Sequence, residues 1–238
     1  MRLLLRRSWN ESIASDILWA FPKSKSWYRI KDDKGNINLR IYFGLKRVMD
    51  FISSMILLPF ILPVMGLVAL AVWIDSPGPV FFSQLRTGQG GRRFKMYKIR
   101  TMVRNAEELK HKYMHLNELT WPDFKITNDP RITRVGKILR KTSLDELPQI
   151  FNVIKGDMSL VGPRPTSFDS STYKLWHTTR LECKPGITGL WQVCGRNELD
   201  FDDRLRLDIA YLRNRCVWLD IKILFHTISC VFTGRGAN

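Results

Sequence analysis

Asp145 and Glu146 are the two side chains best suited to chemistry in this chain of 238 residues. Adjacent carboxylates can hold Mg²⁺, and an ionised aspartate can attack phosphorus as a nucleophile. Arg140 lies shortly upstream, and positive charge beside helix N-terminal amides attracts phosphate. The carboxylate pair therefore indicates chemistry on a phosphorylated substrate.

The same residues also fit a purely structural role. Ser143 and Glu146 have the spacing of a capping box, in which the serine caps a helix and the glutamate reaches back to it. Pro148 argues against this arrangement, because a proline so far into a helix forfeits a backbone hydrogen bond. The spacing alone leaves both alternatives open.

Basic residues elsewhere in the chain could supply phosphate contacts. Arg164 stands between Pro163 and Pro165, which hold the backbone so that the guanidinium loses little entropy when it binds a phosphate. A rigid turn with a surface arginine is the alternative. Lys98 and Arg86 lie at the ends of two expected strands, where they could also be ordinary solvated charges.

Composition narrows the choice of partner. The chain carries 38 Lys and Arg against 22 Asp and Glu, a formal net charge of +16, so we expect an anionic partner. The positive charge is spread along the chain rather than gathered in one tail, which disfavours nucleic acid. The four cysteines lie far apart, and this spacing favours neither a zinc site nor a disulfide framework.

The uncharged run Phe51–Ile74 is long enough to cross a bilayer, which takes roughly 20 residues. Both flanks of the run are basic, so a straight crossing would place one of them outside the cell, against the positive-inside tendency. Two prolines inside the run favour a bend. We therefore expect a re-entrant helix that breaks at Leu62-Pro63, in preference to Leu58-Pro59, with a spanning helix as the alternative.

The remaining pattern predicts an α+β fold that is mainly helical. Elements are expected over residues 80–86 and 94–100 (the two strands of a small β-hairpin), and over 102–119 and 201–215 (helices). Residues 218–232 carry apolar side chains at helical spacing, which indicates a helix that lies in the membrane interface or packs against the core. Residues 1–45 form a leader of unknown role.

Taken in order, these segments resemble the bacterial sugar transferases, also called monotopic phosphoglycosyl transferases. The resemblance covers about residues 46–238. It is carried by motifs at residues 46–51, 86–88, 98–102, 140–149, 156–165, 185–192 and 195–196. Each motif is weak alone, but their shared order over most of the chain is specific.

The resemblance implies an enzyme of the bacterial inner or plasma membrane, acting at the cytoplasmic face. It implies transfer of a sugar-1-phosphate from a UDP-sugar to undecaprenyl phosphate with release of UMP, as the first membrane step of exopolysaccharide or other surface glycan synthesis. It also implies a re-entrant helix over residues 46–75, with its break at Pro63 or Pro59, and a cytosolic catalytic domain over 76–238 with interfacial amphipathic helices.

Specific roles follow from the resemblance. Asp145 would be the nucleophile, forming an aspartyl-phosphosugar intermediate, and Glu146 would be a ligand of Mg²⁺. The expected contacts with substrate and phosphate are Lys98, Arg140, Arg164, Gln192 and Arg196. Both reacting groups are anionic at neutral pH, so neither needs a catalytic base.

The resemblance says less about which sugar is transferred than about the type of reaction. Residues 117–128 are similar to the insert of hexose-transferring members, which points to glucose or galactose. Two other hypotheses are kept: a single-pass, membrane-anchored basic binding protein without catalysis, and a UDP-sugar enzyme with a soluble acceptor. Membrane lipid is an expected partner and nucleic acid is not; a homo-oligomer and contacts with downstream glycosyltransferases stay open.

Overall fold

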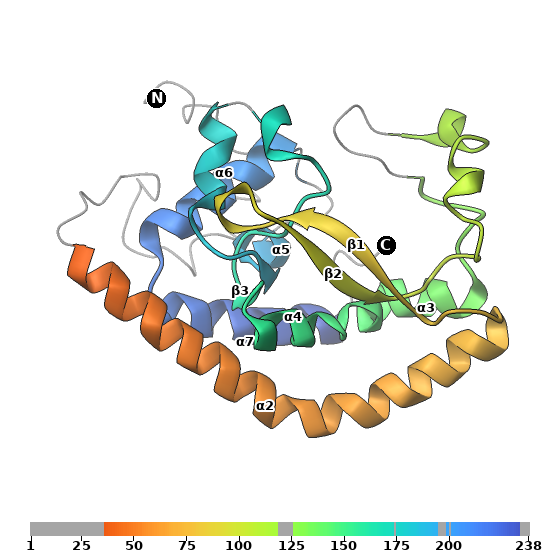
Figure 1. Ribbon diagram of the computed structural model, residues 1–238, viewed down its shortest axis with the longest axis horizontal. Helices are drawn as coiled ribbons and strands as arrows, with labels where there is room; N and C mark the ends of the chain where they lie inside the picture. The colour runs from red at the N-terminus through yellow and green to blue at the C-terminus, as the bar shows by residue number, and fades with distance from the viewer. Residues whose placement is uncertain (1–35, 119–125, 174, 195–198, 200, 234–238) are drawn as a thin grey trace.

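The computed structural model describes residues 36–118, 126–173, 175–194, 199 and 201–233. The helices are α2 (Asn36–Asp75), α3 (Arg134–Thr142), α4 (Gln149–Lys155), α5 (Leu190–Cys194), α6 (Phe201–Asn214) and α7 (Val217–Thr233). The strands are β1 (Phe81–Thr87), β2 (Arg93–Ile99), β3 (Ser159–Val161) and β4 (Gly186–Thr188). The mainly helical α+β class and the small hairpin are confirmed (Figure 1).

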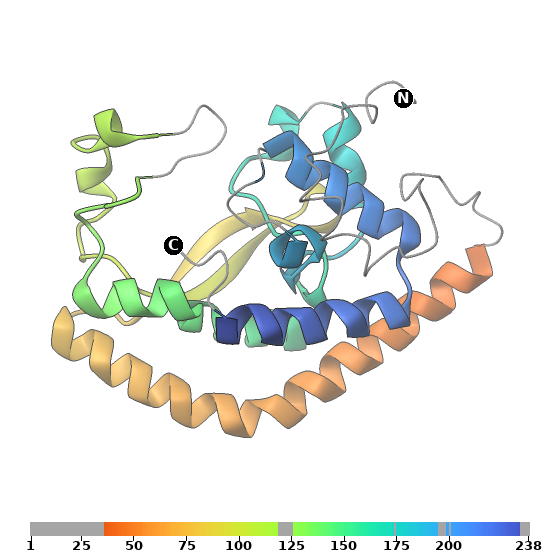
Figure 2. The same ribbon diagram turned by 180° about the vertical axis from the view of Figure 1, so that it is seen from behind.

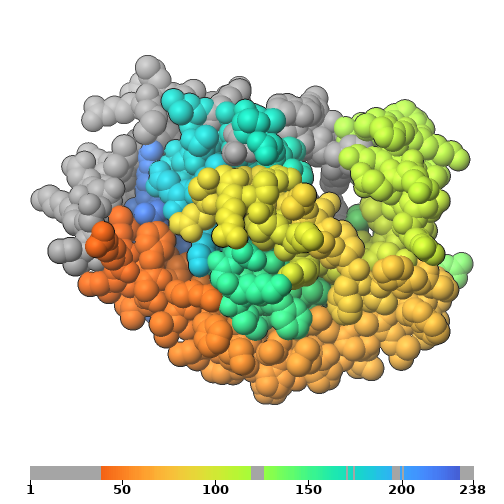
Figure 3. Space-filling view, viewed as in Figure 1, coloured from red at the N-terminus to blue at the C-terminus, as the bar shows by residue number. Residues whose placement is uncertain are grey.

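Helix α2 carries the long apolar run and forms the lower edge of the molecule (Figures 1 and 3). It is helical throughout, with Pro59 and Pro63 inside it. We expected the helix to break at Leu62-Pro63, but it is continuous through this point. It bends near its middle instead, and both arms rise toward the rest of the protein. Its outer side is apolar and open, with Phe60 and Leu67 each 71% exposed.

The N-terminal arm of α2 is bound to the body of the protein by buried polar contacts. Tyr42 Oη and Lys46 Nζ donate to Asp220 Oδ2 in α7, at 2.9 and 2.8 Å. Arg47 donates from its two terminal nitrogens to the carbonyl oxygens of Val153 and Ile154 at the end of α4. These contacts attach the first arm to two different helices of the body.

The C-terminal arm of α2 is attached to the same body by packing. Val68 and Val72 are buried against Ile99 at the end of β2 and Leu139 in α3. Asp75 Oδ2 accepts a hydrogen bond from the backbone N–H of Val135 at 3.0 Å, which satisfies a donor in the first turn of α3. Both ends of the apolar helix are thus held by one folded unit.

The hairpin fixes which side chains of β2 face inward. Strands β1 and β2 are antiparallel, with Phe82 opposite Lys98. Phe94 and Met96 are buried against residues of α4 and β3. Because side chains alternate along a strand, Lys98 lies on the same face of β2 as these two residues. The Asn152 side chain of α4 accepts from Tyr97 N–H and donates to the Lys95 carbonyl, locking α4 to β2.

The helix expected over residues 102–119 is wrong. The described part of this stretch contains turns and two short 3₁₀ helices, Glu108–Lys110 and Met114–Leu116. None of residues 102–118 is buried, so no apolar face packs against the core to stabilise an α-helix. The segment stands to one side of the hairpin in both ribbon views (Figures 1 and 2).

Helix α7 packs against the core, one of the two alternatives that the sequence left open, and its place in the membrane interface stays a prediction. Leu219 and Ile223 are buried in the largest hydrophobic cluster, which also contains residues of α5 and α6. Trp218, Phe225 and Ile228 are exposed on the same helix. Seen from behind, α7 runs across the body just above α2 (Figure 2). One face of α7 therefore packs in the core, and another presents apolar side chains outward.

Gly136, in the first half of α3, lies very close to the backbone of Thr101. A Cβ at this position would lie 2.1 Å from the Thr101 carbonyl oxygen. Glycine to alanine in a helix normally stabilises by about 0.5–1 kcal/mol. Here we expect Gly136→Ala to destabilise by about 1–3 kcal/mol, because a backbone carbonyl cannot swing aside. Thermal unfolding in detergent micelles measures the change.

Gly44→Ala in α2 is the matched control, since the added carbon there meets no atom of the described residues within 4 Å. We expect this variant to be as stable as the unmodified protein or slightly more stable. A melting temperature for Gly136→Ala equal to that of Gly44→Ala would show that α3 and the Thr101 backbone are not in close contact.

Candidate active site

A reversal of the chain after α3 places the two carboxylates. Thr133 caps the start of α3, with its hydroxyl accepting from Gly136 N–H at 3.0 Å. The helix ends at Ser143, whose φ of 58° is the one positive value at a non-glycine residue in the described part of the chain. A 3₁₀ turn over Leu144–Glu146 follows at once and presents both acids.

The capping-box alternative is wrong. The Ser143 side chain makes no capping hydrogen bond, because Ser143 ends α3 in the left-handed conformation rather than starting a new helix. The Glu146 side chain points instead to two cations from distant parts of the chain. Lys98 Nζ donates to Glu146 Oε1 at 2.9 Å, and Arg164 donates to both carboxylate oxygens.

Glu146 is the carboxylate that this arrangement keeps ionised. The Arg164 contact is bidentate, the strong and geometrically specific form of the arginine–carboxylate pair. Burial alone would raise the pKa of Glu146, but the positive charges of Arg164 and Lys98 and their hydrogen bonds hold it well below its usual range. Glu146 therefore carries its negative charge across the whole physiological pH range.

Asp145 is less fully compensated than its neighbour. It is 8% exposed, and its nearest cation is Lys98, whose Nζ lies 3.6 Å from Asp145 Oδ2. Burial raises the pKa of Asp145 above the ordinary aspartate value; Lys98 opposes this shift, whereas the charge of Glu146 adds to it. Asp145 is thus a buried carboxylate whose contact with Lys98, at 3.6 Å, is longer than that of Glu146 at 2.9 Å. Its oxygens are less occupied by cations than those of Glu146.

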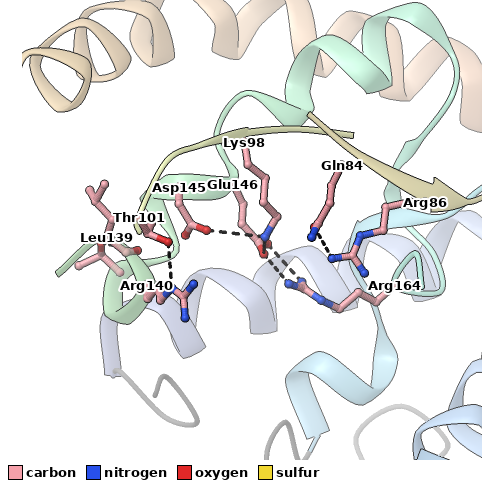
Figure 4. Close-up of polar contacts among 10 residues, drawn as sticks. Gln84, Arg86, Lys98, Thr101, Leu139, Arg140, Asp145, Glu146 and Arg164 are labelled. Carbon is pink, nitrogen blue, oxygen red and sulfur yellow. Dashed lines mark hydrogen bonds and ion pairs between the residues drawn. The ribbon is translucent and has the colours of Figure 1, made fainter. Parts of the chain in front are cut away.

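Arg140 lies beside Asp145, and Arg164 lies beyond Glu146 (Figure 4). Arg140 extends from the last turn of α3, where its Nε donates to Thr101 Oγ1 at 2.9 Å. Arg164 follows β3, on the far side of Glu146. The residues expected from the sequence at 98, 140, 145, 146 and 164 are thus brought together in one cluster.

Arg86 also belongs to this cluster; the sequence left open whether it was a phosphate contact or a solvated charge at the end of a strand. It projects from β1 beside Arg164, and its side chain donates to Gln84 Oε1 (Figure 4). The signal in the sequence was the short motif that begins at Arg86, and the hairpin register, which pairs Arg86 with Phe94, was needed to place it. Thr101, the partner of Arg140, lies within the motif at residues 98–102 but was given no role of its own.

The two remaining expected contacts are Gln192 and Arg196. Gln192 lies in α5, where its Nε2 donates to the Ile187 carbonyl of β4 at 3.1 Å, so the structure sets it against β4. The backbone of Gly162, which precedes Pro163 and Arg164, lies close to Gly189, just after β4: a Cβ on Gly189 would lie 2.3 Å from the Gly162 carbonyl oxygen. Arg196 lies outside the described residues.

The charges of the cluster suit a polyanionic ligand. Two carboxylates, Asp145 and Glu146, face four basic side chains, Arg86, Lys98, Arg140 and Arg164. This leaves an excess of positive charge in a partly buried place, where electrostatic interactions are stronger than in water. A diphosphate would balance it.

Comparisons with known proteins agree with this chemistry. The family described as "Bacterial sugar transferase" matches residues 41–234. The chain is 50% identical over 165 residues to galactosyl transferase CpsE of Streptococcus agalactiae serotype III, covering 68% of this chain and 36% of that protein. It is 42% identical over 228 residues to undecaprenyl-phosphate galactose phosphotransferase of Salmonella typhimurium, covering 94% and 47%.

A third relative matches over most of its own length. Exopolysaccharide production protein ExoY of Rhizobium meliloti is 38% identical over 197 residues, which cover 81% of this chain and 87% of ExoY. The chain spans less than half of CpsE and of the Salmonella protein. By the match over residues 41–234 and by these identities, the chain belongs to the bacterial sugar transferase family.

Proposed function

We propose that this chain transfers a hexose-1-phosphate, galactose or glucose, from a UDP-sugar to undecaprenyl phosphate and releases UMP. The observation that carries the proposal is the buried Asp145 beside the Glu146–Lys98–Arg164 group. The names of two relatives, both of which refer to galactose, support a hexose donor. The name of ExoY supports a place in exopolysaccharide production.

In the first step Asp145 acts as the nucleophile. One of its carboxylate oxygens forms a bond to the β-phosphorus of the UDP-sugar, while the bond from that phosphorus to the bridging oxygen breaks and UMP leaves with the electron pair. The approach of an anion to a diphosphate is opposed by repulsion, which Lys98, Arg140 and Arg164 offset. No base is needed, because the carboxylate attacks in its ionised form.

In the second step the lipid phosphate is the nucleophile. One of its oxygens forms a bond to the phosphorus held on Asp145, while the acyl phosphate bond breaks and restores the carboxylate. The lipid phosphate is already anionic, so this step needs no base either. Two successive displacements predict ping-pong kinetics.

Mg²⁺ fits the donors that the cluster offers. Such sites use one or two carboxylates together with the phosphates of the substrate, and Glu146, with Asp145 next to it, provides those oxygens. Among the described residues no group of three or more His, Cys, Asp or Glu side chains gathers as an alternative site. When bound, the ion would neutralise charge on the diphosphate. Lys98 and Arg164 already contact Glu146, so a bound Mg²⁺ would share the Glu146 carboxylate with these two side chains.

The contacts of α2 support a re-entrant membrane element. Lys46 on one arm and Asp75 on the other both bond to the same folded body. A straight crossing would need that body on both faces of the bilayer. We therefore propose that α2 enters and leaves on the cytoplasmic side, where the UDP-sugar is found, and that the exposed apolar residues of α7 lie in the interface.

The proposal is tested by measuring UMP release from a panel of UDP-hexoses and UDP-N-acetylhexosamines, with and without undecaprenyl phosphate. We expect sustained release only with a hexose donor and the lipid together, and a single turnover without the lipid. An absence of UMP from every donor would refute the transferase assignment.

Asp145→Asn is expected to reduce turnover at least about a thousandfold, because an amide cannot form the acyl phosphate. Asp169→Asn is the control, as Asp169 is exposed and lies outside the cluster. Turnover is followed by UMP release at saturating donor and lipid. A near-normal rate for the Asp145→Asn enzyme would exclude Asp145 as the nucleophile.

The raised pKa of Asp145 predicts the acid limb of the pH profile. The ionised form reacts, so activity is lost as the pH falls through a pKa above the usual value of about 3.9. Lys98→Met should move the limb of the residual activity to higher pH, because the charge that opposes the effect of burial is removed. Lys95→Met, on an exposed lysine of the same strand, should leave it in place; a common limb for both would contradict this electrostatic coupling.

The topology of α2 is tested by thiol labelling of intact and opened cells. Cysteines replacing Arg40 and Pro77, both exposed and near the two ends of α2, should react only when the cytoplasmic side is accessible. In the natural sequence, exposed Cys216 of the body is the standard for labelling from the side on which the body lies. In the two test variants Cys216 is replaced by serine, so that it does not add to the signal. Reaction of either new cysteine in intact cells would establish a spanning helix.

A further inference from the structure

Arg86 and Arg164 form a pair of like charges at one end of the cluster. They lie side by side in Figure 4, on the same side of Asp145. Arg164 is paired with Glu146, whereas Arg86 forms no ion pair with any carboxylate of the described residues. The Nε of Arg86 is buried and has no hydrogen-bond partner among the residues that the structure describes.

The electrostatic situation of Arg86 is unfavourable as it stands. Burial and, after it, the charge of Arg164 lower the pKa of Arg86 to about 10. A buried charge is costly unless it is paired. Gln84 is a neutral partner, and the charge of Glu146, which Arg164 and Lys98 already bind, opposes the lowering of the Arg86 pKa only in part. An anion placed between Arg86 and Arg164 would supply the missing negative charge.

A small hollow adjoins the pair. A hollow beside Arg164 is lined by Thr87, Gly88, Thr166 and Tyr173. Thr87 and Gly88 directly follow Arg86 at the end of β1.

The stereochemistry of the reaction restricts where the two phosphates can bind. In phosphoryl transfer the attacking and leaving oxygens lie roughly in line, on opposite sides of phosphorus. In the first step Asp145 enters and the α-phosphate of UMP leaves from the far side. In the second step Asp145 is the leaving group, so the lipid phosphate has to enter from the side that UMP has vacated.

We propose that Arg86 and Arg164 form one phosphate subsite that is used twice, first by the phosphate of the departing UMP and then by the phosphate of the incoming lipid. This inference rests on the proposed function. It adds Arg86 as a binding residue for both substrates, and it leaves Arg140, which lies beside Asp145, to contact the phosphoryl group that is transferred.

The test separates the two half-reactions. Enzyme is mixed with radiolabelled UDP-hexose without lipid, and formation of labelled protein gives the first rate. The labelled protein is then isolated and mixed with undecaprenyl phosphate, and loss of label gives the second. Arg86→Gln is compared with Arg92→Gln, which removes the same charge from an exposed position of the same hairpin.

We expect Arg86→Gln to slow both half-reactions, each by about ten- to a hundredfold at subsaturating substrate, the range for loss of a charge-assisted hydrogen bond. Arg86→Lys should recover part of both rates, and Arg92→Gln should match the unmodified enzyme. Slowing of the first half-reaction alone would indicate separate subsites and overturn the proposal, as would unchanged rates in both.

Two readouts keep the result interpretable. Melting temperatures of the Arg86→Gln and Arg92→Gln enzymes should agree to within about 2 °C, less than the shift from a 1 kcal/mol loss of stability. The Arg86→Gln enzyme should bind UMP more weakly but bind uridine, which lacks the phosphate, as the unmodified enzyme does. Equal weakening for UMP and uridine would assign Arg86 a structural role and overturn the proposal. If the unmodified enzyme forms no labelled protein, the proposed function fails with it, an outcome distinct from those above.

Discussion

Two adjacent buried carboxylates repel one another, and the need to balance that charge organises the protein. The compensating cations come from separate elements: Lys98 from β2, Arg164 from the segment after β3 and Arg140 from α3. Each element has to be in place before the pair can be buried and ionised, because an unpaired buried charge is strongly unfavourable. The hairpin, the β3–β4 pairing and the turn at Ser143 all serve this balance.

The positive charge that compensates the two acids is divided unequally between them. Glu146 is held by Lys98 and by both terminal nitrogens of Arg164, which fixes its position and its charge. Asp145 has one cation at 3.6 Å and keeps reactive lone pairs. A carboxylate with all its oxygens bonded to cations is a poor nucleophile, so the arrangement favours Asp145 over its neighbour for attack on phosphorus.

How much the sequence could predict follows from the range of the interactions. The hairpin and the apolar helix were predicted correctly, because local periodicity carries them. Short motifs singled out residues 98, 140, 145, 146 and 164, which the structure brings together, and their roles stay predictions. The place of Arg86 depends on strand register, and the helix expected over residues 102–119 failed because its side chains find no core to pack against. The bend in place of a break at the prolines likewise depends on tertiary contacts, since the body holds both arms of α2.

The way α2 is attached determines what can be exchanged in this protein. Its side chains complete the body: Tyr42 and Lys46 pair with Asp220, Asp50 accepts from the Leu160 N–H, and Asp75 accepts from the Val135 N–H. A foreign anchor in its place would leave those groups without partners, at about 1–3 kcal/mol for each buried one. Helix α2 is therefore not a modular tether. It is a component of the folded body, and a chimaera that separates the two would have to rebuild the surface between them.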